Sequence, residues 1–107
     1  MMAKIGIDIV ENKRISLDEN FLKKFLHKQE IELINNLQSD EAKIQFASGR
    51  WAAKEAIIKC LEQKVVANTI NITYRNEKPV IENKEFSTIE LSISHEQNYS
   101  VAVALNI

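Results

Sequence analysis

Glycine, proline and cysteine are scarce in this chain of 107 residues, which holds two glycines, one proline and one cysteine. A Walker-type phosphate loop, a GxGxxG dinucleotide turn and a GxxG RNA clamp each need more glycines than Gly6 and Gly49 can supply. The single Cys60 excludes a disulfide framework and a cysteine-based zinc site, and it favours a reducing, cytoplasmic location. Any bound phosphate must therefore be held by side chains, a metal ion or helix ends.

Long apolar runs and a strong charge imbalance are also missing. The longest apolar run, Val101 to Leu105, is far shorter than the ~20 residues of a membrane span, so we expect no membrane segment and no signal peptide. The formal net charge of −1 argues against broad nucleic-acid binding. A chain of this length can bury one core, and nothing marks a linker or a repeat. We therefore expect a single domain over residues 1–107.

The apolar pattern predicts an α+β protein with helices first and mostly antiparallel strands afterwards. The predicted elements are a strand over 4–10, helices from 16 or 18 to about 27, over 28–37 and from 39 or 40 to about 64, and hairpins with strands over 70–74 and 79–83 and over 89–94 and 99–105. In the last hairpin, alternation predicts five core positions, namely Leu91, Ile93, Val101, Val103 and Leu105.

The predicted central helix, from residue 39 or 40 to about 64, is apolar on two opposite faces. One stripe consists of Ile44, Ala47, Trp51, Ile58 and Val65, and the other consists of Phe46, Gly49, Ala53, Ala56, Ile57 and Cys60. A helix of this kind is covered on both faces, and in so short a chain one cover could be another subunit. We expect Trp51 and Cys60 to serve as core residues.

Two acidic side chains stand beside apolar neighbours. Asp8 interrupts an apolar strand, either on the solvated face of an edge strand or as a metal ligand or base at the sheet surface. Glu55 precedes Lys59 by one helical turn, so the two form either an ordinary i,i+4 surface pair or a partly desolvated site. A desolvated carboxylate usually holds a cation or a metal ion.

The other polar candidates also have two interpretations each. Arg50 and Lys54 are either exposed solubilising charges or phosphate contacts. His95 lies at the end of a strand and is either a structural turn residue or a functional residue. The segment 20–28 carries a net charge of +3. It is either an ordinary charged helix face or a docking site for an acidic partner. Its cations are Lys23, Lys24 and Lys28.

Three motifs, taken in order, resemble those of bacterial holo-acyl-carrier-protein synthases. They are Gly6-Ile7-Asp8-Ile9-Val10-Glu11 with Arg14-Ile15, Gly49-Arg50-Trp51-Ala52-Ala53-Lys54-Glu55-Ala56 with Lys59, and Ile93-Ser94-His95 with Tyr99-Ser100-Val101-Ala102. The resemblance covers the chain from about Lys4 to Leu105. Trp51 stands where phenylalanine is usual, and Glu77 stands where the family tends to have glycine.

The resemblance implies the 4′-phosphopantetheinyl transferase fold, with a long central helix packed on a mostly antiparallel sheet. It also implies transfer of the 4′-phosphopantetheine of coenzyme A to a serine of an acidic apo acyl carrier protein, with release of adenosine 3′,5′-bisphosphate. Such enzymes depend on Mg²⁺ and, in the short type, form homotrimers with active sites between subunits. The expected setting is cytoplasmic fatty acid biosynthesis, a branch of lipid metabolism.

The same resemblance assigns roles to individual residues. Asp8 and Glu55 would be the metal ligands, and together with Lys59 at the diphosphate they would form the catalytic group. The coenzyme A phosphates would be held by Arg50, Lys54, Lys59 and His95. The carrier protein would be bound by Arg14, Lys23, Lys24 and Lys28, and the second apolar stripe of the central helix could be a trimer contact.

Several alternatives stay open at this point. The base that takes the serine proton could be Glu55, a metal-bound water or Lys59. The chain could instead be a non-catalytic binding or assembly module that uses the basic helix and the second apolar stripe, or a small metal-dependent phosphohydrolase. The transferase requires Asp8, Glu55, Lys59 and His95 to converge, within one chain or across a subunit interface, whereas the binding module does not.

Overall fold

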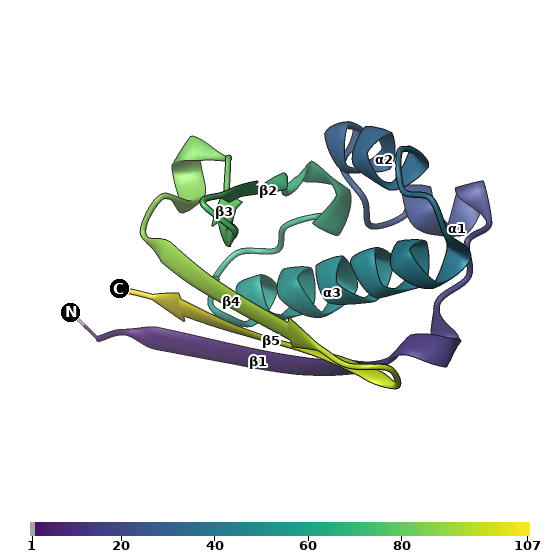
Figure 1. Cartoon of the computed structure of the whole chain (residues 1–107). Coiled ribbons are helices and arrows are strands. Elements are labelled where there is room, and N and C mark those ends of the chain that lie inside the picture. Colours follow the sequence, from purple (N-terminus) through teal and green to yellow (C-terminus); the bar gives the residue numbers. More distant parts are fainter. Residues whose placement is uncertain (1) are drawn as a thin grey trace.

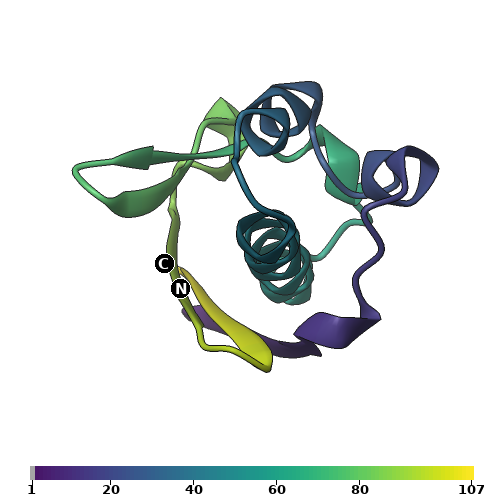
Figure 2. The same ribbon diagram turned by 45° about the vertical axis from the view of Figure 1, so that its right-hand side comes forward.

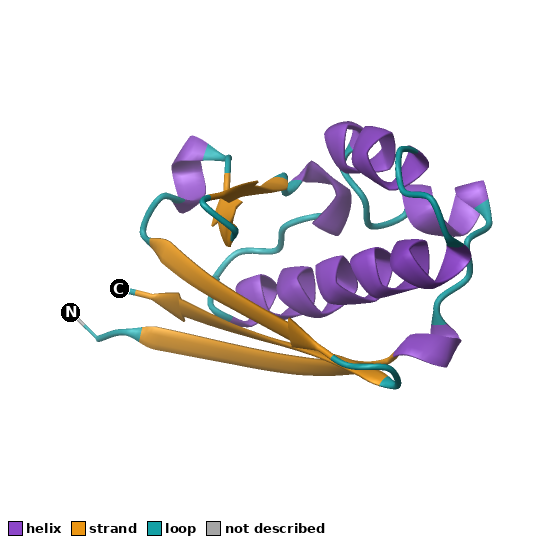
Figure 3. Ribbon diagram, in the orientation of Figure 1, coloured by secondary structure: helices purple, strands orange, loops and turns teal. Residues whose placement is uncertain are grey.

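The computed structural model describes residues 2–107, and its elements follow the order that the sequence predicts (Figures 1 and 3). The α-helices and strands are β1 (Lys4–Glu11), α1 (Glu19–Lys23), α2 (Lys28–Asn35), α3 (Asp40–Lys59), β2 (Ile72–Arg75), β3 (Lys78–Ile81), β4 (Ile89–His95) and β5 (Tyr99–Asn106). Short 3-10 turns lie between some of them, at η1 (Asn12–Arg14), η2 (Ala67–Thr69) and η3 (Lys84–Phe86).

The main sheet has three antiparallel strands in the order β1-β5-β4, so the first and last strands of the chain pair with each other. The strands β2 and β3 form a separate antiparallel hairpin. Asn76 and Glu77 join them with positive φ angles of 52° and 67°. Both central residues of a tight two-residue hairpin turn need this left-handed backbone, which explains why a glycine is favoured at the position of Glu77.

The helix α3 passes through the middle of the molecule, with the three-stranded sheet on one side (Figure 2). The helices α1 and α2 and the β2–β3 hairpin lie around its other side (Figure 2). Ala47, Ala53, Ala56 and Ile57 are all 0% exposed within the single chain. The second apolar stripe is therefore not a trimer contact, because the chain itself covers Ala53, Ala56 and Ile57, whereas Ile44, Trp51 and Ile58 of the first stripe stay half-buried. Within residues 2–107, no helix has the length and hydrophobicity needed to cross a membrane.

Both ends of α3 have local causes. At the N-terminus, the Ser39 side chain accepts a hydrogen bond from the Ala42 backbone N–H, and acidic residues occupy the first turn. At the C-terminus, Cys60 is the last buried residue of the stripe, and the residues after it lie toward the surface. The predicted extension to residue 64 is therefore wrong, because no packed face remains to stabilise another turn. Asp18 caps α1 in the same way as Ser39, but α1 ends already at Lys23.

Small residues line the face of the sheet that packs against α3. They are Gly6 on β1 and Ser100, Ala102 and Ala104 on β5. The larger residues on these strands point to the opposite face, where Ile5, Ile7 and Ile9 pair in register with Leu105, Val103 and Val101. The prediction that Val101, Val103 and Leu105 are core residues is therefore wrong. At Gly6 and along β5 the helix lies too close to the sheet for large side chains, whereas Val10 on β1 and Ile93 on β4 fit beside it.

The closest approach lies at Gly6, where a side chain would overlap the backbone carbonyl of Ala56 and would come within 3.0 Å of Lys59 Cβ. We expect Gly6→Ala to lower the free energy of unfolding by about 3 kcal/mol, because α3 must move away from β1. Gly49→Ala is the matched control: its new Cβ would meet Ile93 Cγ2 at 3.3 Å, and the helix would gain propensity. Its effect should stay within about 1 kcal/mol in denaturant unfolding followed by circular dichroism. Equal losses for the two variants would contradict this account.

Candidate active site

The contact between β1 and α3 brings Asp8 and Lys59 together. The Lys59 Nζ donates to the Ile7 carbonyl at 2.7 Å and lies 3.5 Å from Asp8 Oδ1. The Asp8 side chain is 22% exposed and that of Lys59 is 53% exposed, so both groups are accessible. They line a shallow cavity of about 280 Å³ together with Ile7, Ile9 and Val101. Asp8 is thus not a fully solvated edge residue, since it lies on the face of β1 that turns toward the helix.

Glu55 lies on the same side of α3, one helical turn before Lys59. Gly6 meets Ala56 and Lys59, whereas Asn12, at the other end of β1, accepts a hydrogen bond from Ser48. The strand and the helix therefore run antiparallel, and Asp8 lies beside the helical turn that carries Glu55.

This pair of carboxylates fits a magnesium ion that also binds substrate. Within residues 2–107 no cluster of three or more His, Cys, Asp or Glu side chains is found, so protein groups alone do not complete a metal cage. Mg²⁺ is commonly held by one or two carboxylates, with phosphate oxygens and water in the other positions. Asp8 and Glu55 supply carboxylates of this kind from two elements, and the ammonium group of Lys59 already lies near one of them.

His95 lies on a different edge of the sheet from Asp8. It ends β4, whereas Asp8 belongs to β1, and the central strand β5 separates the two. The imidazole is exposed, and its Cδ2 lies 3.9 Å from the point where a Cβ on Gly49 would stand. The single chain therefore brings together Asp8, Lys59 and the helical turn of Glu55, but it does not bring His95 to them.

Arg50 and Lys54 are 1% exposed, and both pair with the fully buried carboxylate of Glu30. The interpretation of these two cations as exposed solubilising charges is therefore wrong. Their predicted contact with the coenzyme A phosphates stays a prediction, since both side chains are engaged with Glu30 in the single chain. The sequence reasoning missed Glu30, although its position three residues after the helix cap His27 is typical of a capping box.

The Glu30 carboxylate joins three elements through its two oxygens. Oε2 accepts from Arg50 Nε at 2.9 Å and from the Ile72 backbone N–H at 3.2 Å. Oε1 accepts from the Lys54 ammonium and from the His27 backbone N–H. These bonds connect the start of α2, the middle of α3 and the start of β2.

The two cations of this cluster have further partners. Lys54 also donates to the Phe25 carbonyl at 2.7 Å. The Arg50 guanidinium carbon lies 4.3 Å from the centre of the Phe46 ring and 5.1 Å from that of Tyr74. Burial lowers the pKa of the Lys54 ammonium, and the Glu30 carboxylate opposes this effect.

The basic residues expected at a carrier-protein surface are exposed, as a docking role requires. They are Arg14, Lys23, Lys24 and Lys28. Lys23 forms an ion pair with Glu19 at 2.9 Å. Trp51 is a packing residue, since its ring lies 4.8 Å from that of Phe25 and 5.8 Å from that of Phe21. Cys60 is buried, and burial raises the pKa of its thiol.

The fold and these motifs define a class of enzyme. A family model described as the 4′-phosphopantetheinyl transferase superfamily matches residues 4–104, and the chain belongs to this superfamily. The resemblance seen in the sequence and the predicted α+β fold are both confirmed.

Individual relatives narrow this class further. The chain is 51% identical over 105 residues to the holo-[acyl-carrier-protein] synthase of Mycoplasma capricolum, covering 98% of this chain and 94% of that protein. The holo-[acyl-carrier-protein] synthase of Mycoplasma mycoides is 50% identical over the same length and coverage. The crystal structure of a holo-(acyl-carrier-protein) synthase from Bacillus anthracis in complex with CoA (3′,5′-ADP) superposes with a TM-score of 0.85 at 30% identity, covering 95% of this chain and 93% of that one.

The buried charge cluster leads to a stability prediction. Glu30→Gln removes the only negative charge of the cluster and leaves two buried cations without an anion. We expect the free energy of unfolding to fall by about 3–5 kcal/mol, measured by denaturant unfolding. Glu19→Gln breaks the exposed pair with Lys23 and should cost about 0.3–0.5 kcal/mol. A loss below about 1 kcal/mol for Glu30→Gln would show that the cluster is not electrostatically coupled.

Proposed function

We propose that this chain transfers the 4′-phosphopantetheine group of coenzyme A to a serine of an apo acyl carrier protein and releases adenosine 3′,5′-bisphosphate. The observation that carries the proposal is the meeting of Asp8 and Lys59 at the β1–α3 contact, beside the turn of Glu55. The identity of 51% with a holo-[acyl-carrier-protein] synthase supports it, as does the likeness to a structure that contains coenzyme A. Family membership favours this reaction over a binding module or a phosphohydrolase.

In this reaction the serine oxygen forms a bond to the β-phosphorus of the coenzyme A diphosphate. The bond from that phosphorus to the leaving adenosine 3′,5′-bisphosphate breaks, and the serine proton passes to a basic group. Negative charge develops on the phosphoryl oxygens and on the leaving phosphate. Lys59 supplies a cation for these oxygens, and its hydrogen bond to the Ile7 carbonyl holds its ammonium group beside Asp8.

Asp8 and Glu55 would hold Mg²⁺, in agreement with the two-carboxylate arrangement described above. When bound, Mg²⁺ neutralises charge on the diphosphate and orients it for the attack. The role of the two side chains is to offer anionic oxygens from two elements that the Gly6 contact keeps close together.

We further propose that three copies of the chain assemble, with each active site between two of them. The outer face of the sheet supports this, because Ile5, Ile7 and Ile9 are 69%, 59% and 63% exposed in the single chain. They form one apolar surface with Val101, Val103 and Leu105 on the neighbouring strand. A second copy would also explain how His95 comes near Asp8, which it does not do within one chain. The β4 edge of one copy, with His95, would approach the β1 edge of the next copy, with Asp8. His95 would there contact a phosphate of coenzyme A.

The acyl carrier protein would dock at the basic surface formed by Arg14, Lys23, Lys24 and Lys28. Acyl carrier proteins are acidic, so this surface would steer them by charge. A cleft beside it is lined by Lys23, Lys28 and apolar side chains such as Leu26 and Ile31. The cytoplasmic location and the role in fatty acid biosynthesis stay predictions from the sequence.

The activity is tested by mass spectrometry of an apo acyl carrier protein incubated with the chain, coenzyme A and Mg²⁺. We expect the carrier protein to gain the mass of one phosphopantetheine group. Glu55→Gln should slow this modification at least about a hundredfold, because the variant loses an anionic oxygen that would hold Mg²⁺ at the diphosphate. Circular dichroism should show the same fold as the wild type.

Glu62→Gln is the matched control, because this exposed carboxylate pairs with Lys4 just beyond the end of α3. It should leave the rate unchanged. The proposed reaction is contradicted if the wild type modifies none of several carrier proteins. A near-normal rate for Glu55→Gln would show that Glu55 is not a metal ligand, but it would not contradict the proposed reaction.

Assembly is tested separately by light scattering of the purified chain. We expect the mass of a trimer for the wild type and of a monomer for Ile7→Lys, because three buried lysines would face one another in the apolar interface. Leu33→Lys is the control, since Leu33 is 41% exposed on α2, away from the sheet. A monomeric wild type, or a trimer that survives Ile7→Lys, would contradict this interface.

A further inference from the structure

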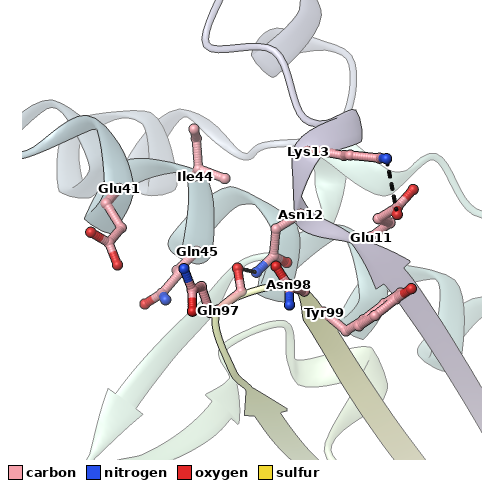
Figure 4. Close-up of a pocket in the computed structure, with 9 residues that line it drawn as sticks. All are labelled: Glu11, Asn12, Lys13, Glu41, Ile44, Gln45, Gln97, Asn98 and Tyr99. Atoms are coloured by element: carbon pink, nitrogen blue, oxygen red, sulfur yellow. Dashed lines mark hydrogen bonds and ion pairs between the residues drawn. The ribbon is translucent and has the colours of Figure 1, made fainter.

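One buried asparagine binds the turn between β4 and β5 (Figure 4). Asn12 lies in η1 and is 4% exposed. Its Nδ2 donates to the Glu96 carbonyl at 2.9 Å and to the Gln97 carbonyl at 3.1 Å. Its backbone N–H donates to the Asn98 carbonyl at 2.8 Å. A single residue, 84 positions before Glu96, therefore binds three successive carbonyls of this turn.

The other side of the Asn12 amide is held by two buried hydroxyls. Ser48 on α3 donates to Asn12 Oδ1 at 2.7 Å, and Ser100 on β5 donates to the same oxygen at 2.9 Å. The turn carbonyls only accept hydrogen bonds, so the amide nitrogen must face the turn and the amide oxygen must face the hydroxyls. The orientation of Asn12 is therefore fixed from both sides.

Three partners of Asn12 lie on the elements around His95. Ser48 precedes Gly49, the residue over which the imidazole lies. Ser100 is the register partner of His95 on β5, and Glu96 follows His95 directly. The hydrogen bonds of Asn12 therefore fix the helix, the strand and the turn that surround this exposed histidine.

We propose that Asn12 is a positioning residue for coenzyme A binding, which holds the β4–β5 turn so that His95 is presented to a phosphate of the ligand. This inference rests on the proposed function, in which His95 contacts that phosphate. Asn12 itself is buried beneath the turn, so the proposal gives it no direct contact with coenzyme A. Its effect passes through the backbone of Glu96 and Gln97 to the histidine beside them.

The turn also has internal restraints of its own, since the Glu96 backbone N–H donates to the Tyr99 carbonyl at 2.9 Å. The Glu96 carboxylate accepts from the backbone N–H groups of Asn98 and Tyr99, each at 2.8 Å. These bonds close the turn but do not attach it to the rest of the molecule, whereas the bonds of Asn12 attach it to η1 and α3. Asn12→Ala would keep the backbone bond to the Asn98 carbonyl, but it would release the carbonyls of Glu96 and Gln97, so the part of the turn next to His95 would move relative to Gly49.

The test compares wild type and Asn12→Ala as the full chain, with coenzyme A, Mg²⁺ and an apo acyl carrier protein. We expect KM for coenzyme A to rise about tenfold, the scale seen when a residue that orients a ligand-binding side chain is removed. The kcat should stay within about twofold, since Asp8, Glu55 and Lys59 are unchanged. Calorimetry with coenzyme A alone should show a matching rise in Kd.

Ser48→Ala is the matched control, because it removes a buried hydrogen bond of the same cluster but leaves the bonds from Asn12 to the turn. It should lower stability and leave KM for coenzyme A unchanged. In a His95→Ala background, Asn12→Ala should raise KM little further, because the two residues act through one contact. An unchanged KM in Asn12→Ala, an equal rise in Ser48→Ala, or full additivity with His95→Ala would overturn the proposal.

A second variant keeps the proposal testable if Asn12→Ala does not fold. Asn12→Leu combined with Ser48→Ala and Ser100→Ala replaces the whole polar cluster by apolar groups, so no hydroxyl is left unpaired. This variant should also raise KM and Kd for coenzyme A, and unchanged values would overturn the proposal.

A wild type that binds coenzyme A without transferring it would contradict the proposed function alone, and the Kd comparison would still decide the role of Asn12. A wild type that does not bind coenzyme A would contradict both.

Discussion

The close contact between Gly6 and Ala56 determines how the rest of the site is built. Because β1 carries no side chain at this point, α3 lies directly on the sheet, and the neighbouring strand must supply small residues such as Ala102 and Ala104. The same contact determines which helical turn Asp8 lies beside, and it lets the Lys59 ammonium group reach Asp8. It also turns the large side chains of β1 and β5 outward, where they form the apolar surface proposed to bind further copies. Packing, the proposed catalytic site and the proposed assembly thus depend on one pair of backbones that lie very close together.

The buried carboxylate of Glu30 plays the corresponding role on the other side of α3. Two cations and one anion are enclosed there, so the cluster keeps a net positive charge away from solvent. Desolvation offsets much of the attraction within such a cluster, and its net contribution to stability is small even though breaking it is costly. Its main consequence is geometric, because a different orientation of α2 would separate both cations from their only anionic partner in the cluster. The basic surface proposed to bind the carrier protein is thereby held in a fixed position relative to Asp8 and Lys59.

Much of the fold could be predicted from local patterns, because alternation and capping are properties of neighbouring residues. Strand β1, the Ser39 cap and both hairpins follow from such patterns. Local patterns correctly predicted that Leu91 and Ile93 of β4 pack against the core. They did not predict which face of β5 is buried, since residue size favours Val103 as a core position whereas the close helix selects Ala102. For the site, the motif residues Asp8 and Lys59 do meet, but the burial of Arg50 depends on a carboxylate 20 positions away. The role of Asn12 likewise depends on a turn near the other end of the chain, which no short pattern reveals.

The central claim is that the β1–α3 contact holds two carboxylates that bind the metal ion and, through it, the diphosphate of coenzyme A. The most direct measurement is a crystal structure of the chain grown with coenzyme A and Mn²⁺ in place of Mg²⁺, with anomalous data that locate the manganese. The account predicts one manganese ion per active site, bonded to carboxylate oxygens of both Asp8 and Glu55 and to an oxygen of the diphosphate, with Lys59 beside it. Manganese bonded to neither carboxylate while coenzyme A is bound would contradict the account.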